Sequence, residues 1–187
     1  MQHIRGLFHQ PTLEWVAINQ ESYKSVFFIL RNYFLTFLFL IPFSISLRLF
    51  FVHGDFKLIF YQAWLIGWII LGGYFFILYL MSIIMEEAAN FMGGKAVPGS
   101  GAKLSYFSAL PFLFMLILAP LPRVGFIIML VSFAYNIALI YIGASEIFKL
   151  EGSKKILWFV SVVVSFLLLL FLVLLLAALI SLFMHII

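Results

Sequence analysis

Residues 60–85 read "FYQAWLIGWIILGGYFFILYLMSIIM", a run without Asp, Glu, Lys or Arg. At 1.5 Å per residue a helix of this length measures about 39 Å, which exceeds the roughly 30 Å hydrocarbon core of a bilayer. Glu86 and Glu87 follow at once, and the glycines and proline of residues 93–101 form the clearest helix-breaking cluster in the chain. The run therefore predicts a membrane-spanning helix over about residues 58–90 that leaves the bilayer near the paired carboxylates.

The whole chain has the composition of an integral membrane protein. Of its 187 residues, 66% are hydrophobic and 10% are charged, against roughly 45–50% and 25% in soluble domains. We predict an all-α fold: a polytopic membrane helix bundle with five transmembrane helices, which forms a single domain over residues 1–187. The predicted spans are residues 26–52, 58–90, 104–119, 124–148 and 156–185.

Residues 1–25 precede the first predicted span and are expected to form an arm at the membrane surface. Pro11 can occupy the first turn of a helix. Trp15 and Tyr23 are residue types that favour the headgroup region. The arm is therefore predicted to be an interfacial segment rather than a further span.

The basic residues are distributed unevenly among the predicted loops. If the amino terminus is inside, the inner segments carry seven Lys and Arg residues, with Arg31 at the boundary, and the outer segments carry three. Short inner loops of membrane proteins are enriched in Lys and Arg. The count therefore predicts an internal amino terminus and an external carboxy terminus.

Several short segments of the chain are similar to those of one known family. They are "HIRGLF" at residues 3–8, then Pro11, "WVAINQE" at residues 15–21, "YFSALPF" at residues 106–112 and "YIG" at residues 141–143. In this order, and with five predicted spans, the chain resembles Yip-domain membrane proteins, and within them the small bacterial branch. The resemblance covers nearly the whole chain.

The resemblance implies a five-span protein of the bacterial cytoplasmic (inner) membrane, with a cytoplasmic amino terminus and a periplasmic carboxy terminus. Eukaryotic members are associated with Ypt/Rab GTPases and vesicle traffic. A bacterium lacks that machinery, and this chain lacks the long acidic amino-terminal region of many eukaryotic members. The GTPase partner is therefore not carried over to this chain.

The carboxylates at the inner ends of the spans allow two interpretations. They could form a site for a cation, a proton or a partner if the helix ends meet, because hard cations prefer several oxygen ligands. They could instead be interfacial groups neutralised by basic neighbours, as the i,i+3 spacing of Glu146 and Lys149 favours. The candidate site residues are Glu86, Glu87, Glu146 and Asn90, and the candidate charge partners are Arg31, Lys103 and Lys149.

Polar and small residues inside the predicted spans indicate helix packing. Asn136, with Tyr135 and Tyr141, is the most polar group near mid-membrane, and interhelical hydrogen bonding explains it better than a substrate site does. Gly67 and the pair Gly72-Gly73 are expected to allow close helix contact.

Sequence motifs for catalysis, cofactors and metals are missing from the chain. There is no zinc-protease, nucleophile-elbow, phosphate-loop or dinucleotide pattern. There is no cysteine, and His3 with His9 falls short of a zinc ligand set. No segment gathers the basic surface that nucleic-acid binding requires.

We therefore predict a non-enzymatic inner-membrane protein, without a cofactor, that acts through protein partners or membrane organisation. Its expected partners are the lipid bilayer and other membrane proteins, or further copies of itself in a homo-oligomer. The alternative is a small channel or transporter for an ion or small solute, since intramembrane charge and proline-broken helices accompany transport.

Overall fold

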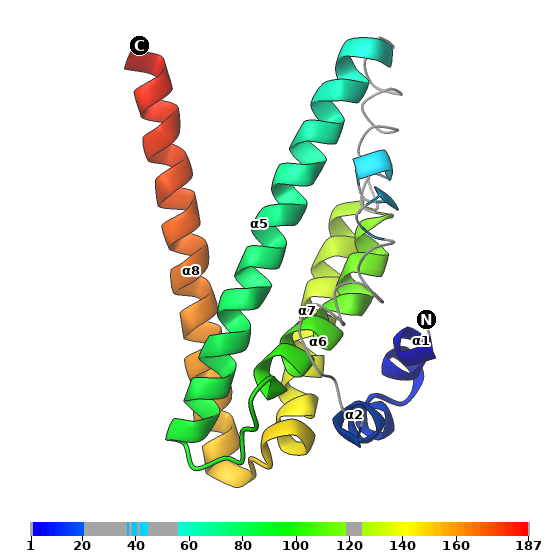
Figure 1. The fold of residues 1–187 in the computed structure, drawn as a ribbon, viewed down its shortest axis with the longest axis vertical. Coiled ribbons are helices and arrows are strands. Elements are labelled where there is room, and N and C mark those ends of the chain that lie inside the picture. Colours follow the sequence, from blue (N-terminus) through cyan, green and yellow to red (C-terminus); the bar gives the residue numbers. More distant parts are fainter. Residues whose placement is uncertain are drawn as a thin grey trace.

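The computed structural model describes residues 2–20, 37, 39–40, 42–44, 56–118 and 125–186. Apart from turns and loops, these residues are helical, and they contain no strand, which confirms the all-α prediction for them. The labelled helices (Figure 1) are α1 Gln2–His9, α2 Pro11–Gln20, α5 Phe56–Phe91, α6 Ser100–Leu116, α7 Gly125–Phe148 and α8 Gly152–Ile186.

Three stretches among the described residues are long and apolar enough to cross a membrane: Gly67–Phe91 in α5, Gly125–Phe148 in α7 and Gly152–Leu169 in α8. They support the prediction of a membrane protein. Five transmembrane helices are not confirmed, because α6 has only 17 residues. Most of the predicted span 26–52 lies outside the described residues.

Residues with positive φ angles mark the junctions between the long helices. Gly93, with a φ of 75°, follows the end of α5, and Gly99, with a φ of 87°, precedes α6. Lys149, which follows α7, and Gly152, which is the first residue of α8, each have a φ of 56°. A left-handed residue ends a right-handed helix, and glycine adopts that conformation without a steric penalty.

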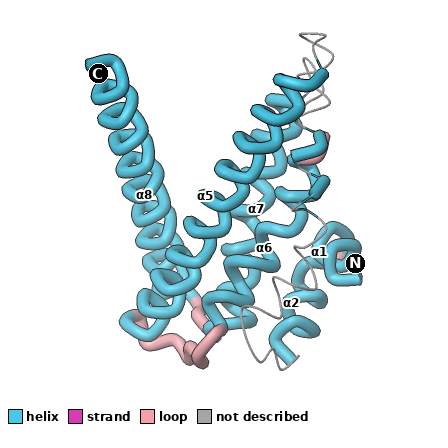
Figure 2. Tube along the Cα trace, turned by 45° about the horizontal axis from the view of Figure 1, so that its top comes forward, coloured by secondary structure: helices cyan, strands magenta, loops and turns pink. Residues whose placement is uncertain are grey.

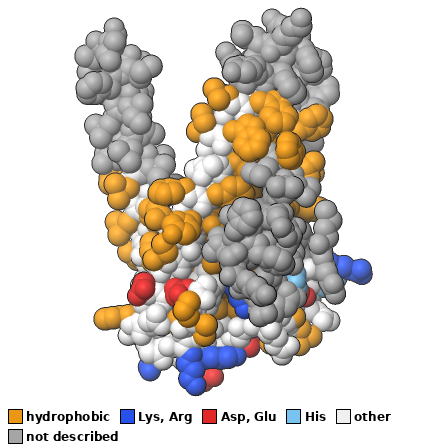
Figure 3. Space-filling model, in the orientation of Figure 1, with side chains coloured by type: hydrophobic (Ala, Val, Ile, Leu, Met, Phe, Trp, Pro, Cys, Tyr) orange, Lys and Arg blue, Asp and Glu red, His pale blue; other side chains and the backbone are white. Residues whose placement is uncertain are grey.

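Helices α5 and α8 meet at one end of the molecule and diverge toward the other, so that they form a V (Figures 1 and 2). The loops 92–99 and 149–151 lie where the two helices meet, and we call this the loop end. Helix α6 packs against both α5 and α7. The space-filling view shows Lys, Arg, Asp and Glu side chains gathered toward the loop end, with apolar side chains over the helices beyond it (Figure 3).

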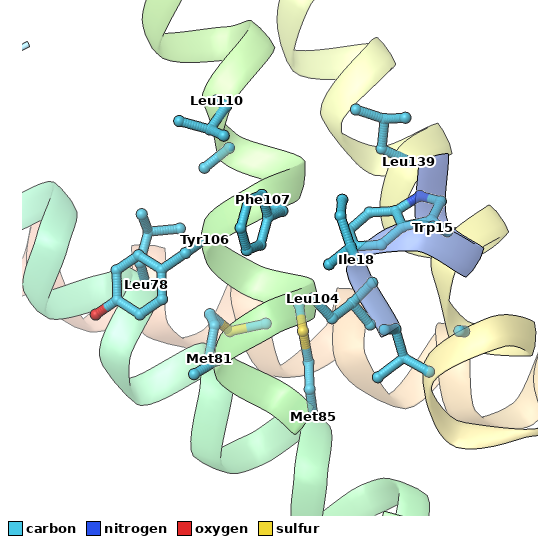
Figure 4. Packing of buried hydrophobic residues seen from close by; sticks show 14 of the residues in the cluster. Trp15, Ile18, Leu78, Met81, Met85, Leu104, Tyr106, Phe107, Leu110 and Leu139 are labelled. Carbon is cyan, nitrogen blue, oxygen red and sulfur yellow. The ribbon is translucent and has the colours of Figure 1, made fainter. Parts of the chain in front are cut away.

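The hydrophobic core centres on α6. Leu104, Phe107 and Leu110 of this helix are fully buried. Figure 4 shows them between α5, which contributes Met81 and Met85, and the side that carries α7 and the arm. Because its neighbours cover α6, this helix is an interior element of the bundle.

The arm packs against the bundle as two short helices. Helix α2 contacts α7, and α1 contacts both α2 and α6. Trp15 is fully buried, and a Cβ atom at Gly143 would lie 2.7 Å from its indole ring. Trp15, a residue type that favours the headgroup region, is thus covered by the protein itself, because its indole fills the space that Gly143 leaves on α7. Tyr23 lies outside the described residues.

Candidate functional site

The Glu86 side chain caps the first turn of α6. Its Oε2 atom accepts hydrogen bonds from the backbone N–H groups of Gly99 and Gly101, both at 3.1 Å. The first N–H groups of a helix have no partner within it, and they carry partial positive charge that favours an anion. The two segments approach closely here, since a Cβ atom at Gly101 would lie 2.0 Å from the Ser82 carbonyl oxygen. Glu86 therefore joins α5 to α6.

The side chains of Glu87 and Asn90 are exposed, whereas Glu86 is half-buried. Successive residues on a helix are rotated by about 100°, so the adjacent carboxylates face different surroundings.

Glu146 takes part in a second junction, between α7 and the arm. Its Oε2 atom lies 3.5 Å from Nζ of Lys149. Its backbone carbonyl accepts a hydrogen bond of 2.9 Å from the side-chain amide of Asn19. The backbone carbonyl of Asn19 in turn accepts a hydrogen bond of 3.3 Å from Nζ of Lys103. Asn19 thereby links the last turn of α7 to the first turn of α6.

The carboxylates do not gather into a metal site in the described part of the chain. Within residues 2–20, 37, 39–40, 42–44, 56–118 and 125–186, no group of three or more His, Cys, Asp or Glu side chains is placed to hold a metal ion. His3 contacts the carboxylate of Glu14, and His9 contacts the Arg5 carbonyl. Arg31 lies outside the described residues.

Further hydrogen bonds hold the loop end together. The indole N–H of Trp158 donates to the Met85 carbonyl at 3.0 Å and joins α8 to α5. The backbone N–H of Lys95 donates to the Phe148 carbonyl at 2.8 Å and joins the loop 92–99 to α7. The loop end is therefore a bonded junction of all four long helices.

The polar residues of α7 have three different environments. The Tyr135 hydroxyl donates to the Leu7 carbonyl in the arm. The Tyr141 ring packs edge-on against Phe159, and Nζ of Lys155 lies 3.9 Å from its centroid. Asn136 is 9% exposed, and its Oδ1 atom has no hydrogen-bond partner among the described residues.

Asn136 lines a cavity of about 320 Å³ between α5, α6, α7 and α8. In the same described part of the chain, the Tyr74 hydroxyl also has no hydrogen-bond partner. The two serines of the lining are bonded to backbone carbonyls, Ser105 to Leu78 at 2.9 Å and Ser108 to Ser105 at 3.0 Å. The remaining lining is apolar, and it includes Met81, Met85, Phe112, Phe133, Phe159 and Phe166. An apolar pocket with a few unpaired polar groups is the usual form of a small-molecule site.

Of the two described lining residues with an unpaired polar atom, sequence reasoning identified Asn136 and missed Tyr74. It lies in the middle of an uninterrupted apolar run, directly after Gly72-Gly73. In the sequence, nothing distinguishes it as a candidate site residue from Tyr61 or Tyr79 of the same run. Only the packing of four helices brings it to the same cavity as Asn136.

Comparisons of the chain with protein-family models, with curated proteins and with solved structures gave no match. The resemblance to Yip-domain proteins stays a prediction.

Proposed function

We propose that this chain is a five-span protein of the bacterial cytoplasmic membrane, without catalytic activity, that acts by binding the transmembrane helix of another protein or of a second copy. The observation that carries the proposal is a row of exposed residues along α5, at alternating steps of four and three residues. We call it the outer stripe: Leu65, Ile69, Gly72, Phe76, Tyr79 and Ile83. This spacing is that of helices that pack side by side at a shallow angle.

Glycine at the centre of the stripe supports a helix as the occupant. Gly72 and Gly73 are exposed, and a Cβ atom at either would meet no described atom within 4 Å. At Gly67, by contrast, a Cβ atom would lie 2.9 Å from Cα of Pro42, so that glycine is explained by contact within the chain. Glycine in a helix costs about 0.5–1 kcal/mol relative to alanine. In membranes, small residues let a second helix approach closely.

The proposed orientation places the loop end in the cytoplasm. Of the described lysines, Lys95, Lys149, Lys154 and Lys155 lie in or beside the two loops of this end. The arm contacts α6 and α7 near the same end (Figure 1). Enrichment of cytoplasmic loops in Lys and Arg supports a cytoplasmic amino terminus and a periplasmic carboxy terminus.

Photo-crosslinking in native membranes tests the proposal. A photoreactive residue in place of Ile69, on the outer stripe, is expected to give a discrete adduct whose mass identifies a second copy or another membrane protein. The same residue in place of Val164, which is 48% exposed on α8, is the matched control. The substitution Gly72→Leu, which fills the gap in the stripe, should reduce the Ile69 adduct about fivefold, as expected for losing roughly 1 kcal/mol of helix contact.

Three outcomes would count against this function. They are equal adducts from Ile69 and Val164, no adduct from Ile69, and an adduct that Gly72→Leu leaves unchanged. Robust ion or solute flux through the purified protein in proteoliposomes would instead favour a channel or transporter. The carboxylates that a transporter would use, Glu86 and Glu146, have partners within the chain.

A further inference from the structure

The cavity between the four long helices lies on the side of α5 opposite to the outer stripe. Tyr74, Leu78, Met81 and Met85 of its lining are rotated by about half a turn from Gly72 on an ideal helix. What the cavity binds is therefore a separate question from which helix packs on the stripe. Its volume of about 320 Å³ is at the lower end of the range for small-molecule sites.

Two unpaired polar atoms distinguish this cavity from a packing defect. The Tyr74 hydroxyl and the Asn136 Oδ1 atom are buried, and neither has a hydrogen-bond partner within the part of the chain that the structure describes. Buried polar groups are almost always paired in native proteins, because an unpaired one loses its bonds to water without replacement. Both residues line the cavity, and each polar atom is closed off from it in this structure, so a ligand that supplies the missing bonds must displace the wall at these two points.

The depth of these atoms decides the class of ligand. Asn136 precedes Glu146 by ten residues on α7, and Tyr74 precedes Glu86 by twelve on α5. Those separations correspond to about 15 and 18 Å along the helices. With Glu86 and Glu146 at the edge of the membrane, both atoms lie at about half the depth of a 30 Å hydrocarbon core. A phosphate or ammonium headgroup is strongly disfavoured at that depth. The polar part of the ligand must therefore be uncharged.

A hydroxyl group matches both unpaired atoms. It can accept a hydrogen bond from the Tyr74 O–H and donate one to the Asn136 Oδ1 atom, whereas a carbonyl could only accept. We propose that this cavity binds an uncharged, lipid-soluble alcohol, with its hydroxyl between Tyr74 and Asn136 and its hydrocarbon chain along the apolar lining. Beyond the cavity α8 leans away from α5 (Figure 1), and the chain of the ligand extends into lipid on that side.

Photolabelling of the full chain in phospholipid nanodiscs tests this site. The probe is hexadecanol with a diazirine in its chain and a terminal alkyne. Label is expected on α5, α7 and α8 peptides that line the cavity. Unlabelled hexadecanol should compete. Hexadecane lacks both hydrogen bonds and should compete roughly 25-fold less well, which is about fivefold for each net hydrogen bond. Hexadecyl phosphate should also compete poorly, because its charge is disfavoured at this depth.

Two variants remove the polar atoms and keep the shape of the lining. Tyr74→Phe and Asn136→Leu should each reduce labelling about fivefold. Tyr79→Phe, which removes a hydroxyl from the 48%-exposed tyrosine of the outer stripe, should leave it unchanged. Without probe, Tyr74→Phe should unfold at the same or a higher temperature than the parent, since it removes an unpaired buried hydroxyl. This variant decides the question if Asn136→Leu does not fold.

The proposal fails if both variants label like the parent, or if hexadecane competes as well as hexadecanol, since the cavity would then accept any hydrocarbon. It also fails if hexadecyl phosphate competes best, which would indicate a charged lipid, or if the label lies outside the cavity lining. These outcomes leave the helix-binding proposal untouched, because its test reads adducts from Ile69.

Discussion

Removing the Glu86 carboxylate should destabilise the junction of α5 and α6, whereas removing its neighbour should not. Glu86 accepts hydrogen bonds from the N–H groups of Gly99 and Gly101. Glu87 is exposed, and no hydrogen bond or ion pair is found for its side chain among the described residues. The pair therefore provides a test and a control one residue apart.

The expected change in the free energy of unfolding follows from the way Glu86 caps α6. Loss of a helix-capping side chain costs about 0.5–2 kcal/mol, and loss of a negative charge at a helix amino terminus costs about 0.3–1 kcal/mol. Glu86→Ala is expected to lower the free energy of unfolding by about 2 kcal/mol. The loss should stay below the largest sum of the two terms, because the bond to Gly99 is exposed and water can partly replace it. For Glu86→Gln, which keeps an acceptor and loses the charge, we expect about 0.5–1 kcal/mol. Glu87→Gln should stay within about 0.5 kcal/mol of the parent.

Reversible unfolding in detergent micelles, followed by tryptophan fluorescence, measures these differences. Trp158 is a suitable reporter, because its indole N–H is bonded to the Met85 carbonyl one residue before Glu86. The order Glu86→Ala, Glu86→Gln, Glu87→Gln, from most to least destabilised, is expected. The capping argument is refuted if Glu87→Gln costs as much as Glu86→Gln, or if Glu86→Ala costs nothing.

Four other substitutions test different parts of the packing. Gly143→Ala should destabilise the chain by about 1–3 kcal/mol in chemical unfolding, because its Cβ atom would lie 2.5 Å from a leucine methyl carbon of α6; Gly72→Ala, which meets no described atom, should stabilise it by about 0.5–1 kcal/mol. Trp158→Phe should loosen the contact of α8 with α5 at a cost of about 1–3 kcal/mol, which spin-label distances between the two helices would report. Tyr135→Phe should speed proteolysis within the arm, because it removes the hydrogen bond to the arm backbone.

Each of these expectations has a clear contrary result. Equal effects of Gly143→Ala and Gly72→Ala would contradict the close approach of α6 to α7 at Gly143. An unchanged distance distribution in Trp158→Phe would show that apolar packing alone holds α5 and α8 together. Unchanged proteolysis in Tyr135→Phe would remove the role of that hydroxyl in holding the arm.

Helix positions were largely predictable, because their signals are local. The predicted span 58–90 corresponds to α5 at Phe56–Phe91, and 124–148 corresponds to α7 at Gly125–Phe148. A hydrophobic run and a glycine that ends a helix each depend only on residues close in sequence, so both can be recognised without knowledge of the tertiary structure. The third predicted span, 104–119, corresponds to α6 at Ser100–Leu116. Hydropathy does not distinguish a helix covered by other helices from one covered by lipid.

The partners of individual side chains were less predictable. Trp15 is a residue type that favours the membrane surface. In the structure it is buried against Gly143, more than a hundred residues away in the sequence. The paired carboxylates illustrate the same limit. Helical rotation predicts that Glu86 and Glu87 differ, but it does not say which of them meets α6.

By itself, the sequence determined the class of the protein, the positions of the long helices and the polar boundary at Glu86 and Glu87, since hydrophobicity and chain breaking depend on residues close in sequence. Only the tertiary structure decided that Glu86 caps α6 and that Tyr74 and Asn136 share one cavity. Both results depend on the rotation of each helix about its axis and on contacts between distant segments. Packing of the whole bundle sets those quantities.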